Sequence, residues 1–282
     1  MTSSTVAGPL SKGRLTPGAD APGADAPAAP VRIERRAPGE AAAAFVRHFW
    51  LPRWSLPSGA SLRETVLEYP TANLVIEADT AALHRANRGL SGRTLTGDGW
   101  AFGALLRPGV ARQWVGVSLR GAPLVIPLEA LEPLAARALT AAVGAVRECL
   151  ADDDAEGAIA VVEAALGDLP APDADARLVD AIVAAVEADR DLRRVEQLAD
   201  RFGIGVRHLQ RLVAGHVGFG PKWLIQRYRL QEAAAALREP GPPALARLAA
   251  DLGYADQAHF SREFKAVVGV TPEAYAAESR RS

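Results

Sequence analysis

The sequence predicts an α+β protein in which a small β-barrel-like N-terminal domain with a helical extension precedes an all-α domain of two helix-turn-helix units. Three observations lead to this fold class. Short apolar runs between turn residues fill the first half, Ala- and Leu-rich segments with helical spacing follow, and one pattern occurs twice near the end of the chain. We therefore expect four regions, with bounds at 1–37, 38–128, 129–177 and 178–282.

The composition bounds the class of protein. The chain has 282 residues, of which 49% are hydrophobic and 23% charged, with a net charge of −1. These values are typical of globular chains and exclude a wholly disordered or polycationic protein. From Arg190 onward, however, 15 Lys or Arg stand against 10 Asp or Glu, and the rest of the chain carries 17 against 23. This asymmetry favours a polyanion partner for the C-terminal region, with ordinary charge scatter as the alternative.

The cysteine and apolar content bear on the compartment. Cys149 is the single cysteine, so the chain forms no internal disulfide and no thiolate zinc cluster. The first thirty residues lack the apolar core of a signal peptide, and no apolar stretch reaches the length of a membrane span. We expect a cytoplasmic protein without a membrane partner.

Residues 1–37 are expected to form a disordered tail. The first thirty contain five prolines and a doubled Gly-Ala-Asp-Ala-Pro, with almost nothing large and apolar to bury.

The region 38–128 is expected to be β-rich, as a small barrel or sandwich. Trp100, Phe102, Ala104 and Leu106 alternate as in a half-buried strand, and the following Arg107-Pro108-Gly109 favours a type II turn. The runs that predict strands are 45–56, 64–78, 100–106, 113–119 and 124–128.

The region 129–177 is expected to be a helical connector or dimerisation region. Helical spacing of Ala and Leu extends over 129–150, 155–166 and 176–188, and Pro170-Ala171-Pro172 marks the break before the last of these segments.

The region 178–282 contains the repeat. The first copy is Leu198-Ala199-(3)-Gly203-Ile204, Leu209-Gln210-Arg211-Leu212 and Gly218-Phe219-Gly220-Pro221; the second is Leu248-Ala249-(3)-Gly253-Tyr254, Phe260-Ser261-Arg262-Glu263-Phe264 and Gly269-Val270-Thr271-Pro272. Two helix-turn-helix units explain this spacing, because Gly203 and Gly253 tolerate the positive φ of a sharp turn into a second helix. Such a second helix is the element that enters a DNA major groove.

This third of the chain resembles the DNA-binding domain of the AraC/XylS family of bacterial transcription regulators. The stretch from Gly253-Tyr254-Ala255-Asp256 through Phe264-Lys265 to Gly269 and Pro272 follows the family pattern closely. The resemblance implies a linker helix over 222–237, about 24 Å long, which would set two reading helices along one side of the duplex. Gly205 stands where relatives commonly have a capping Ser, and Ala258 replaces a usual polar residue.

The N-terminal half resembles the sensor portion of some AraC-like regulators. Gly103, Arg107-Pro108-Gly109 and the aromatic residues Phe45, Phe49, Trp50 and Trp54 carry this resemblance. It implies a sensor-like domain that binds a small-molecule effector or mediates homodimerisation. The implied partners are double-stranded DNA and RNA polymerase, and no cofactor is implied.

Specific side chains are expected to contact DNA. Residues three and four apart share a helix face, and Arg and Gln bond bidentately to guanine and adenine. We expect the base-reading residues to be Arg207, Gln210, Arg211, Gln257, Ala258, Ser261 and Arg262, and the phosphate contacts to be His208, His259 and Lys265. Leu209, Leu212, Phe260 and Phe264 should face the core. The alternative for the polar residues is a solvated helix face, or packing and backbone contacts in the second unit.

The tryptophans, histidines and Cys149 bear on ligand, metal and redox sites. Trp50, Trp54, Trp100 and Trp114 are candidates to line an effector pocket, although core packing is an alternative for at least two of them. The histidines lack the spacing of a zinc site, so no metal is expected, and Cys149 in its Ala-rich segment is typical of an inert residue rather than a redox sensor. Motifs of nucleophilic or phosphate-binding enzymes do not occur.

We therefore expect a sequence-specific DNA-binding transcription regulator rather than an enzyme. The alternative is a ligand- or protein-binding module that no longer reads DNA.

Overall fold

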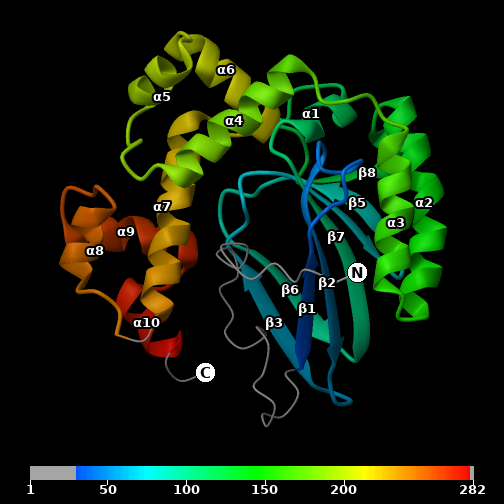
Figure 1. Ribbon diagram of the computed structural model, residues 1–282. Helices are drawn as coiled ribbons and strands as arrows, with labels where there is room; N and C mark the ends of the chain where they lie inside the picture. Colours follow the sequence, from blue (N-terminus) through cyan, green and yellow to red (C-terminus); the bar gives the residue numbers. More distant parts are fainter. Residues whose placement is uncertain (1–29, 240, 280–282) are drawn as a thin grey trace.

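The computed structural model describes residues 30–239 and 241–279, and it consists of an N-terminal sheet with flanking helices and a C-terminal set of helices (Figure 1). The predicted α+β class is confirmed. The tail expected over 1–37 lies mostly outside the described residues. Its last part, Val31–Arg36, is strand β1 and pairs with its neighbour, so this part of the expectation was wrong.

The main sheet is open and six-stranded, in the order β1-β2-β7-β4-β5-β8, and a separate two-stranded sheet pairs β3 with β6. The expected barrel-like closure is therefore wrong: β1 and β8 are the two edges and do not pair with each other. The remaining strands are β2 (Val46–Ser55), β3 (Ser61–Val66), β4 (Asn73–Glu77), β5 (Ala81–His84), β6 (Ser91–Thr96), β7 (Asp98–Leu106) and β8 (Val125–Pro127).

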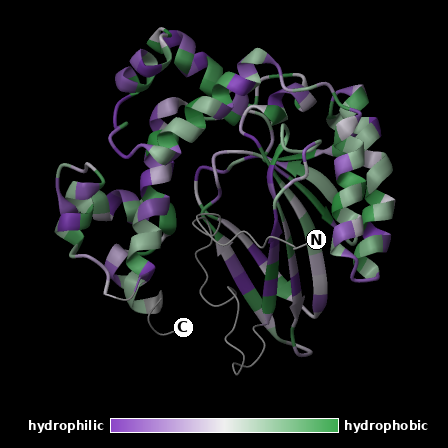
Figure 2. Cartoon of the chain, in the orientation of Figure 1, coloured by the Kyte–Doolittle hydropathy of each residue, from purple (hydrophilic) through white to green (hydrophobic). Residues whose placement is uncertain are grey.

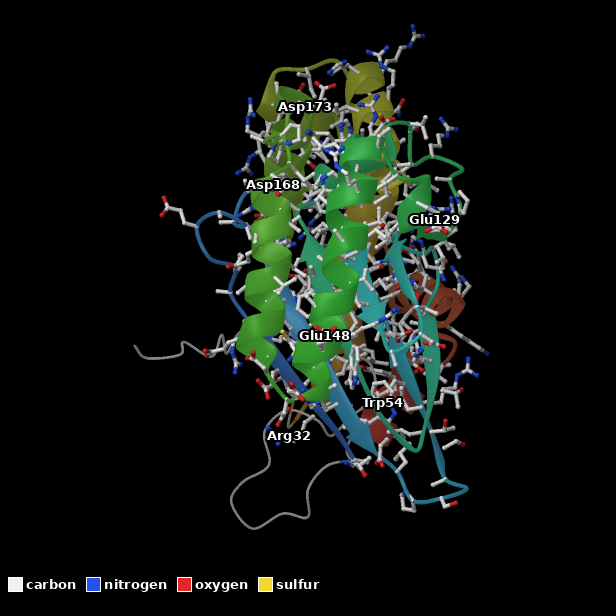
Figure 3. The ribbon with its side chains drawn as sticks, turned by 90° about the vertical axis from the view of Figure 1, so that its right-hand side faces the viewer. Arg32, Trp54, Glu129, Glu148, Asp168 and Asp173 are labelled. Carbon is white, nitrogen blue, oxygen red and sulfur yellow. The ribbon has the colours of Figure 1, made fainter. Side chains whose placement is uncertain are left out.

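Period-two alternation divides the main sheet into two faces. Phe49, Leu74, Phe102 and Leu106 are buried on one face, in a cluster that includes residues of the helical hairpin α2 (Pro133–Ala151) and α3 (Ala155–Gly167). Figure 3 shows these two helices side by side over the strands. The opposite face is turned toward β3, β6 and the C-terminal helices (Figure 1). The main sheet thus lies between the α2–α3 hairpin and the C-terminal domain.

Two strand predictions need correction. The run 64–78 contains the end of β3 and all of β4, separated by a loop over 67–72, and the run 113–119 instead forms part of the helix α1 (Val110–Val115) and a loop. The expected type II turn is absent because Gly109 has φ −83° and is the N-cap of α1. A Cβ at Gly109 would collide with the backbone of Ala176, so this glycine permits close approach of another helix. A 3-10 helix, η2 (Leu128–Ala130), follows β8.

The C-terminal helices form the expected repeat. Gly203 (φ 62°) and Gly253 (φ 74°) both adopt left-handed conformations, as predicted for the two turns. Figure 2 shows apolar and polar segments alternating along these helices, as in amphipathic helices. The helices are α4 (Ala174–Ala188), α5 (Val195–Phe202), α6 (Val206–Val217), α7 (Pro221–Arg238), α8 (Leu245–Asp251), α9 (Gln257–Val268) and α10 (Pro272–Ser279).

Buried apolar residues connect the two domains. Tyr69 and Leu105 belong to the core of α4–α7, and Leu67 belongs to the core of α7–α10. Because α4 packs in the C-terminal core rather than with α3, we place the division between the domains at 168–173, a few residues before the expected 178. None of the helices in the described part of the chain is long and apolar enough to cross a membrane.

Candidate nucleic-acid interface and cavity

The second helix of the first unit, α6, exposes the residues expected to read bases. Arg207, Gln210 and Arg211 are all exposed, whereas Leu209 and Leu212 are buried at 0% and 5% relative exposure. Gly205 is the N-cap and forms no side-chain capping hydrogen bond, so N–H groups at this helix end are left for other partners. His208, expected at phosphate, lies 3.1 Å from a guanidinium nitrogen of Arg211 through its Nδ1 and thus contacts a predicted base reader.

The second helix of the second unit, α9, is built in the same way but capped differently. Asp256 accepts a hydrogen bond from the backbone N–H of His259 at 2.6 Å, which fixes the helix start. Gln257, Ala258 and Arg262 are exposed and Ser261 is half-buried, whereas Phe260 and Phe264 are fully buried. Lys265 is exposed in the last turn. The structure thus brings the predicted base-reading residues to the outward faces of two equivalent helices.

His259 has a local partner that the sequence did not indicate. Its Nε2 lies 3.7 Å from Glu263, which also accepts a hydrogen bond from the hydroxyl of Tyr254 at 3.3 Å. Burial raises the pKa of Tyr254 well above its usual range, so that hydroxyl stays protonated and donates. A phosphate at His259 would therefore compete with a carboxylate.

The linker helix α7 is fixed by the N-terminal domain. Arg227 is 2% exposed, and its Nη2 donates to the carbonyls of Asn87 (2.6 Å) and Arg88 (2.7 Å). Its guanidinium also stacks over Trp223, 4.8 Å from the ring centre. Burial lowers the pKa of Arg227 to about 10. One turn later, the side-chain amide of Gln231 donates to the carbonyls of Leu67 and Glu68.

A cavity of about 590 Å³ lies on the face of the main sheet that is turned away from α2 and α3. Trp50 and Trp54 line it, and they pair across the sheet with Gly103 and Gly99. A Cβ at either glycine would collide with the facing indole, so these glycines let the rings lie over β7. The indole of Trp50 donates to the side-chain oxygen of Asn73 at 3.1 Å, which holds the ring in place.

Polar groups in the cavity wall are partly paired among themselves. Arg93 forms an ion pair with Glu77, and Glu68 accepts a hydrogen bond from the backbone N–H of Asn87. His48 is 4% exposed, and its Nδ1 has no hydrogen-bond partner among the described residues. Burial, with the charges of Arg35 and Arg47, lowers the pKa of His48 to about 4, so this imidazole is neutral at neutral pH. The cavity therefore combines aromatic walls with an unpaired buried nitrogen.

The other two tryptophan candidates do not line this cavity. Trp114 is 3% exposed in the core between the sheet and the hairpin, where it contacts Phe45, and Trp100 packs against the same core. Trp100 lies on the other side of the sheet because it is displaced by one residue from the cavity-lining positions Ala101 and Leu105 of β7, and Trp114 lies on α1. Cys149 is half-buried against that core, and the described residues hold no cluster of His, Cys, Asp or Glu suited to a metal.

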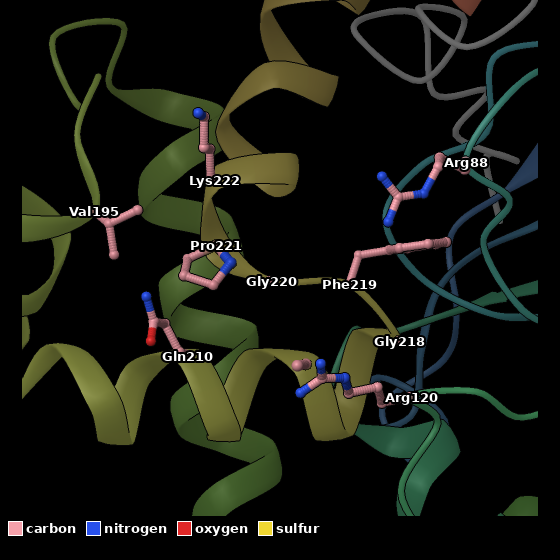
Figure 4. A pocket seen from close by; sticks show the side chains of 10 residues that line it. Arg88, Arg120, Val195, Gln210, Gly218, Phe219, Gly220, Pro221 and Lys222 are labelled. Carbon is pink, nitrogen blue, oxygen red and sulfur yellow. The ribbon is translucent and has the colours of Figure 1, made fainter.

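The sequence did not indicate a groove at the junction of α6 and α7. Arg88 and Arg120, from two loops of the N-terminal domain, line it together with Gln210 and Lys222 (Figure 4). Only the tertiary structure brings these segments together, so no local pattern could have identified them.

Comparisons with known proteins match both halves of the chain. Residues 198–278 match the family described as "Helix-turn-helix domain", and residues 34–121 match a domain of unknown function, DUF6597. An uncharacterized HTH-type transcriptional regulator of Haemophilus influenzae is 31% identical over 101 residues, which are 36% of this chain and 34% of that protein. The transcriptional activator RhaS of Escherichia fergusonii is 35% identical over 77 residues, 27% of each chain. The matches thus span about a third or less of these relatives' length.

Among solved structures, ToxT from Vibrio cholerae with a bound unsaturated fatty acid is 12% identical to this chain, with a TM-score of 0.35. The match covers 87% of this chain and 94% of the ToxT chain.

The repeat, the two left-handed glycine turns and the helix-turn-helix match over 198–278 agree with one another. Residues 198–278 are therefore a helix-turn-helix domain, and over about a third of its length or less the chain is similar to HTH-type transcriptional regulators.

Proposed function

We propose that the chain is a sequence-specific transcription regulator that reads DNA bases with α6 and α9 and is controlled through the sheet domain. One observation carries the proposal: two equivalent helices expose Arg207, Gln210, Arg211 and Arg262 while burying Leu209 and Phe260. These exposed side chains can bond to guanine and adenine edges in the major groove. At about 1.5 Å per residue, the 18 residues of α7 span about 27 Å, which suits two reading helices on successive major-groove faces of one duplex. RNA polymerase is the partner through which such a bound regulator acts.

Two substitutions separate reading bases from holding phosphates. Arg211→Ala should cost about 1 to 3 kcal/mol on the operator and relax preference at one base pair, with little effect on scrambled DNA. Lys265→Ala should weaken both duplexes alike and shrink the salt slope of log K by about 1. Both are exposed residues, so melting temperatures should be unchanged. If Arg211→Ala lowers the affinities for operator and scrambled DNA equally and leaves the base preference intact, then α6 does not read bases in the major groove as proposed.

The alternative is a ligand- or protein-binding module whose helix-turn-helix units no longer read DNA. It predicts acidic or bulky apolar replacements on the outward faces of α6 and α9. Those faces carry arginine and glutamine instead, which favours the DNA-reading function.

We further propose that a small-molecule effector occupies the cavity beside Trp50 and Trp54. The unpaired Nδ1 of His48 offers it a polar contact, and the two indoles offer apolar area. The cavity adjoins the contacts with α7. Glu68 and Asn87 both line the cavity, and their backbone carbonyls accept hydrogen bonds from side chains of α7. Homodimerisation through the same domain is the other means of control.

Tryptophan fluorescence tests the cavity. Binding of a molecule from a metabolite library should change the emission and raise the melting temperature. Trp50→Phe should reduce the response, whereas Trp100→Phe, on the opposite side of the sheet, should retain it. A library without any hit, in a protein whose dimerisation depends on this domain, would favour a structural role for the domain.

A further inference from the structure

The groove at the junction of α6 and α7 is a basic surface shared by both domains (Figure 4). It has a volume of about 350 Å³ and is lined by Arg88 and Arg120 of the N-terminal domain and by Gln210 and Lys222 of the reader. None of the described residues that line it is acidic. A groove with three cations and no internal anion fits a polyanionic partner.

Helix α6 anchors the loop that carries Arg120. The backbone N–H of Leu119 donates to the carbonyl of Gly215 at 2.8 Å. Gly215 lies in the last turn of α6, where carbonyls lack partners within the helix, so this hydrogen bond satisfies one of them. Leu119 is 1% exposed, which anchors the loop, whereas the next residue, Arg120, is exposed.

Arg88 is also held on both sides. Its guanidinium lies 5.3 Å from the ring centre of Phe219, in the segment between α6 and α7. Its backbone carbonyl accepts a hydrogen bond from the buried Arg227. Within the described part of the chain, no ion pair involves Arg88, Arg120 or Lys222. The positive charges of these three side chains are therefore available to a partner.

The groove continues the predicted reading face of α6. Gln210 and Ala214 both line it and are one turn apart, which is about 6 Å along the helix axis. Phosphates border both sides of the DNA major groove, which is about 12 Å wide. With Gln210 against base edges, the cations that line the protein groove beside Gln210 would face the sugar-phosphate backbone of the same duplex.

We propose that Arg88 and Arg120 contact DNA phosphates, so that the N-terminal domain forms part of the DNA-binding surface. This inference depends on the proposed reading function of α6. Its consequence is that DNA affinity depends on how the two domains are docked, since only the docked arrangement places these arginines beside α6.

The salt dependence of DNA binding by the full chain tests the proposal. Arg88→Ala and Arg120→Ala should each shrink the slope of log K against log salt concentration by about 1, and the double variant by about 2. Affinities for operator and scrambled duplex should fall by the same factor, because phosphate contacts carry no base preference. Arg120→Lys should retain the slope, because it keeps the charge.

Arg137→Ala is the matched control, since Arg137 is an exposed arginine of the same domain on α2, across the sheet from the reader. Melting temperatures establish that each variant folds. A wild-type slope in the double variant would overturn the inference, as would a loss confined to the operator. Failure of the wild-type chain to bind any duplex would instead refute the proposed function, so the two failures are distinguishable.

Discussion

The buried His48 should make the sheet domain sensitive to acid. The pKa of His48 is lowered from 6.5 to about 4 in the folded protein, by burial first and then by Arg35 and Arg47. Between these two values the unfolded chain binds a proton that the folded chain does not, so stability is lost as pH falls from 6.5 toward 4. At pH 5 the difference covers 1.5 pKa units, and at about 1.4 kcal/mol per unit it amounts to about 2 kcal/mol.

Chemical denaturation at pH 7 and pH 5 measures this effect. The wild-type chain should lose about 2 kcal/mol more than His48→Gln between the two pH values, because glutamine does not titrate. The same comparison above pH 7 serves as a control, since neither state of His48 is then protonated. If the two chains lose equal stability on acidification, then the imidazole is already protonated or solvated in the folded state, and the description of the cavity wall is wrong.

Three further substitutions test the domain contacts and the cavity. Gly103→Ala should cost about 1 to 3 kcal/mol of stability and shift the tryptophan emission, because the new Cβ would displace the Trp50 ring; calorimetry and fluorescence measure both. Arg227→Met should lower the unfolding free energy by about 2 to 4 kcal/mol, because the carbonyls of Asn87 and Arg88 lose a charged donor that is itself buried. Urea titration measures this loss, and an unchanged midpoint would show that these contacts do not hold α7. Gly253→Ala should cost about 1 kcal/mol through its positive φ, and a melting curve indistinguishable from wild type would contradict that backbone assignment.

The C-terminal domain was predictable because its signals are local and occur twice. Gly203 and Gly253 mark turns that require positive φ, and the apolar residues between them repeat at helical spacing. The outward placement of Arg207 and Arg262 follows from that spacing alone. The DNA contacts themselves stay predictions, since only their exposure is observed.

The N-terminal domain was less predictable because closure of a sheet depends on which strands become neighbours. Alternation correctly placed Phe102 and Leu106 on a core face, yet nothing local reveals that β1 and β8 remain unpaired edges. The proline-glycine pair at 108–109 was misread because the glycine serves close packing against Ala176 rather than a turn. Nothing local in the sequence indicates the groove that Arg88 and Arg120 line, because their two loops meet α6 and α7 only in the folded chain.

Selection of duplexes from a random DNA pool by the purified chain tests the central claim most directly. If α6 and α9 both read bases, repeated rounds should enrich one asymmetric motif with two contacted segments about one helical turn apart. The Arg211→Ala chain should enrich the same motif with one position relaxed. Recovery of unrelated sequences at the affinity of bulk DNA would contradict sequence-specific reading by these helices.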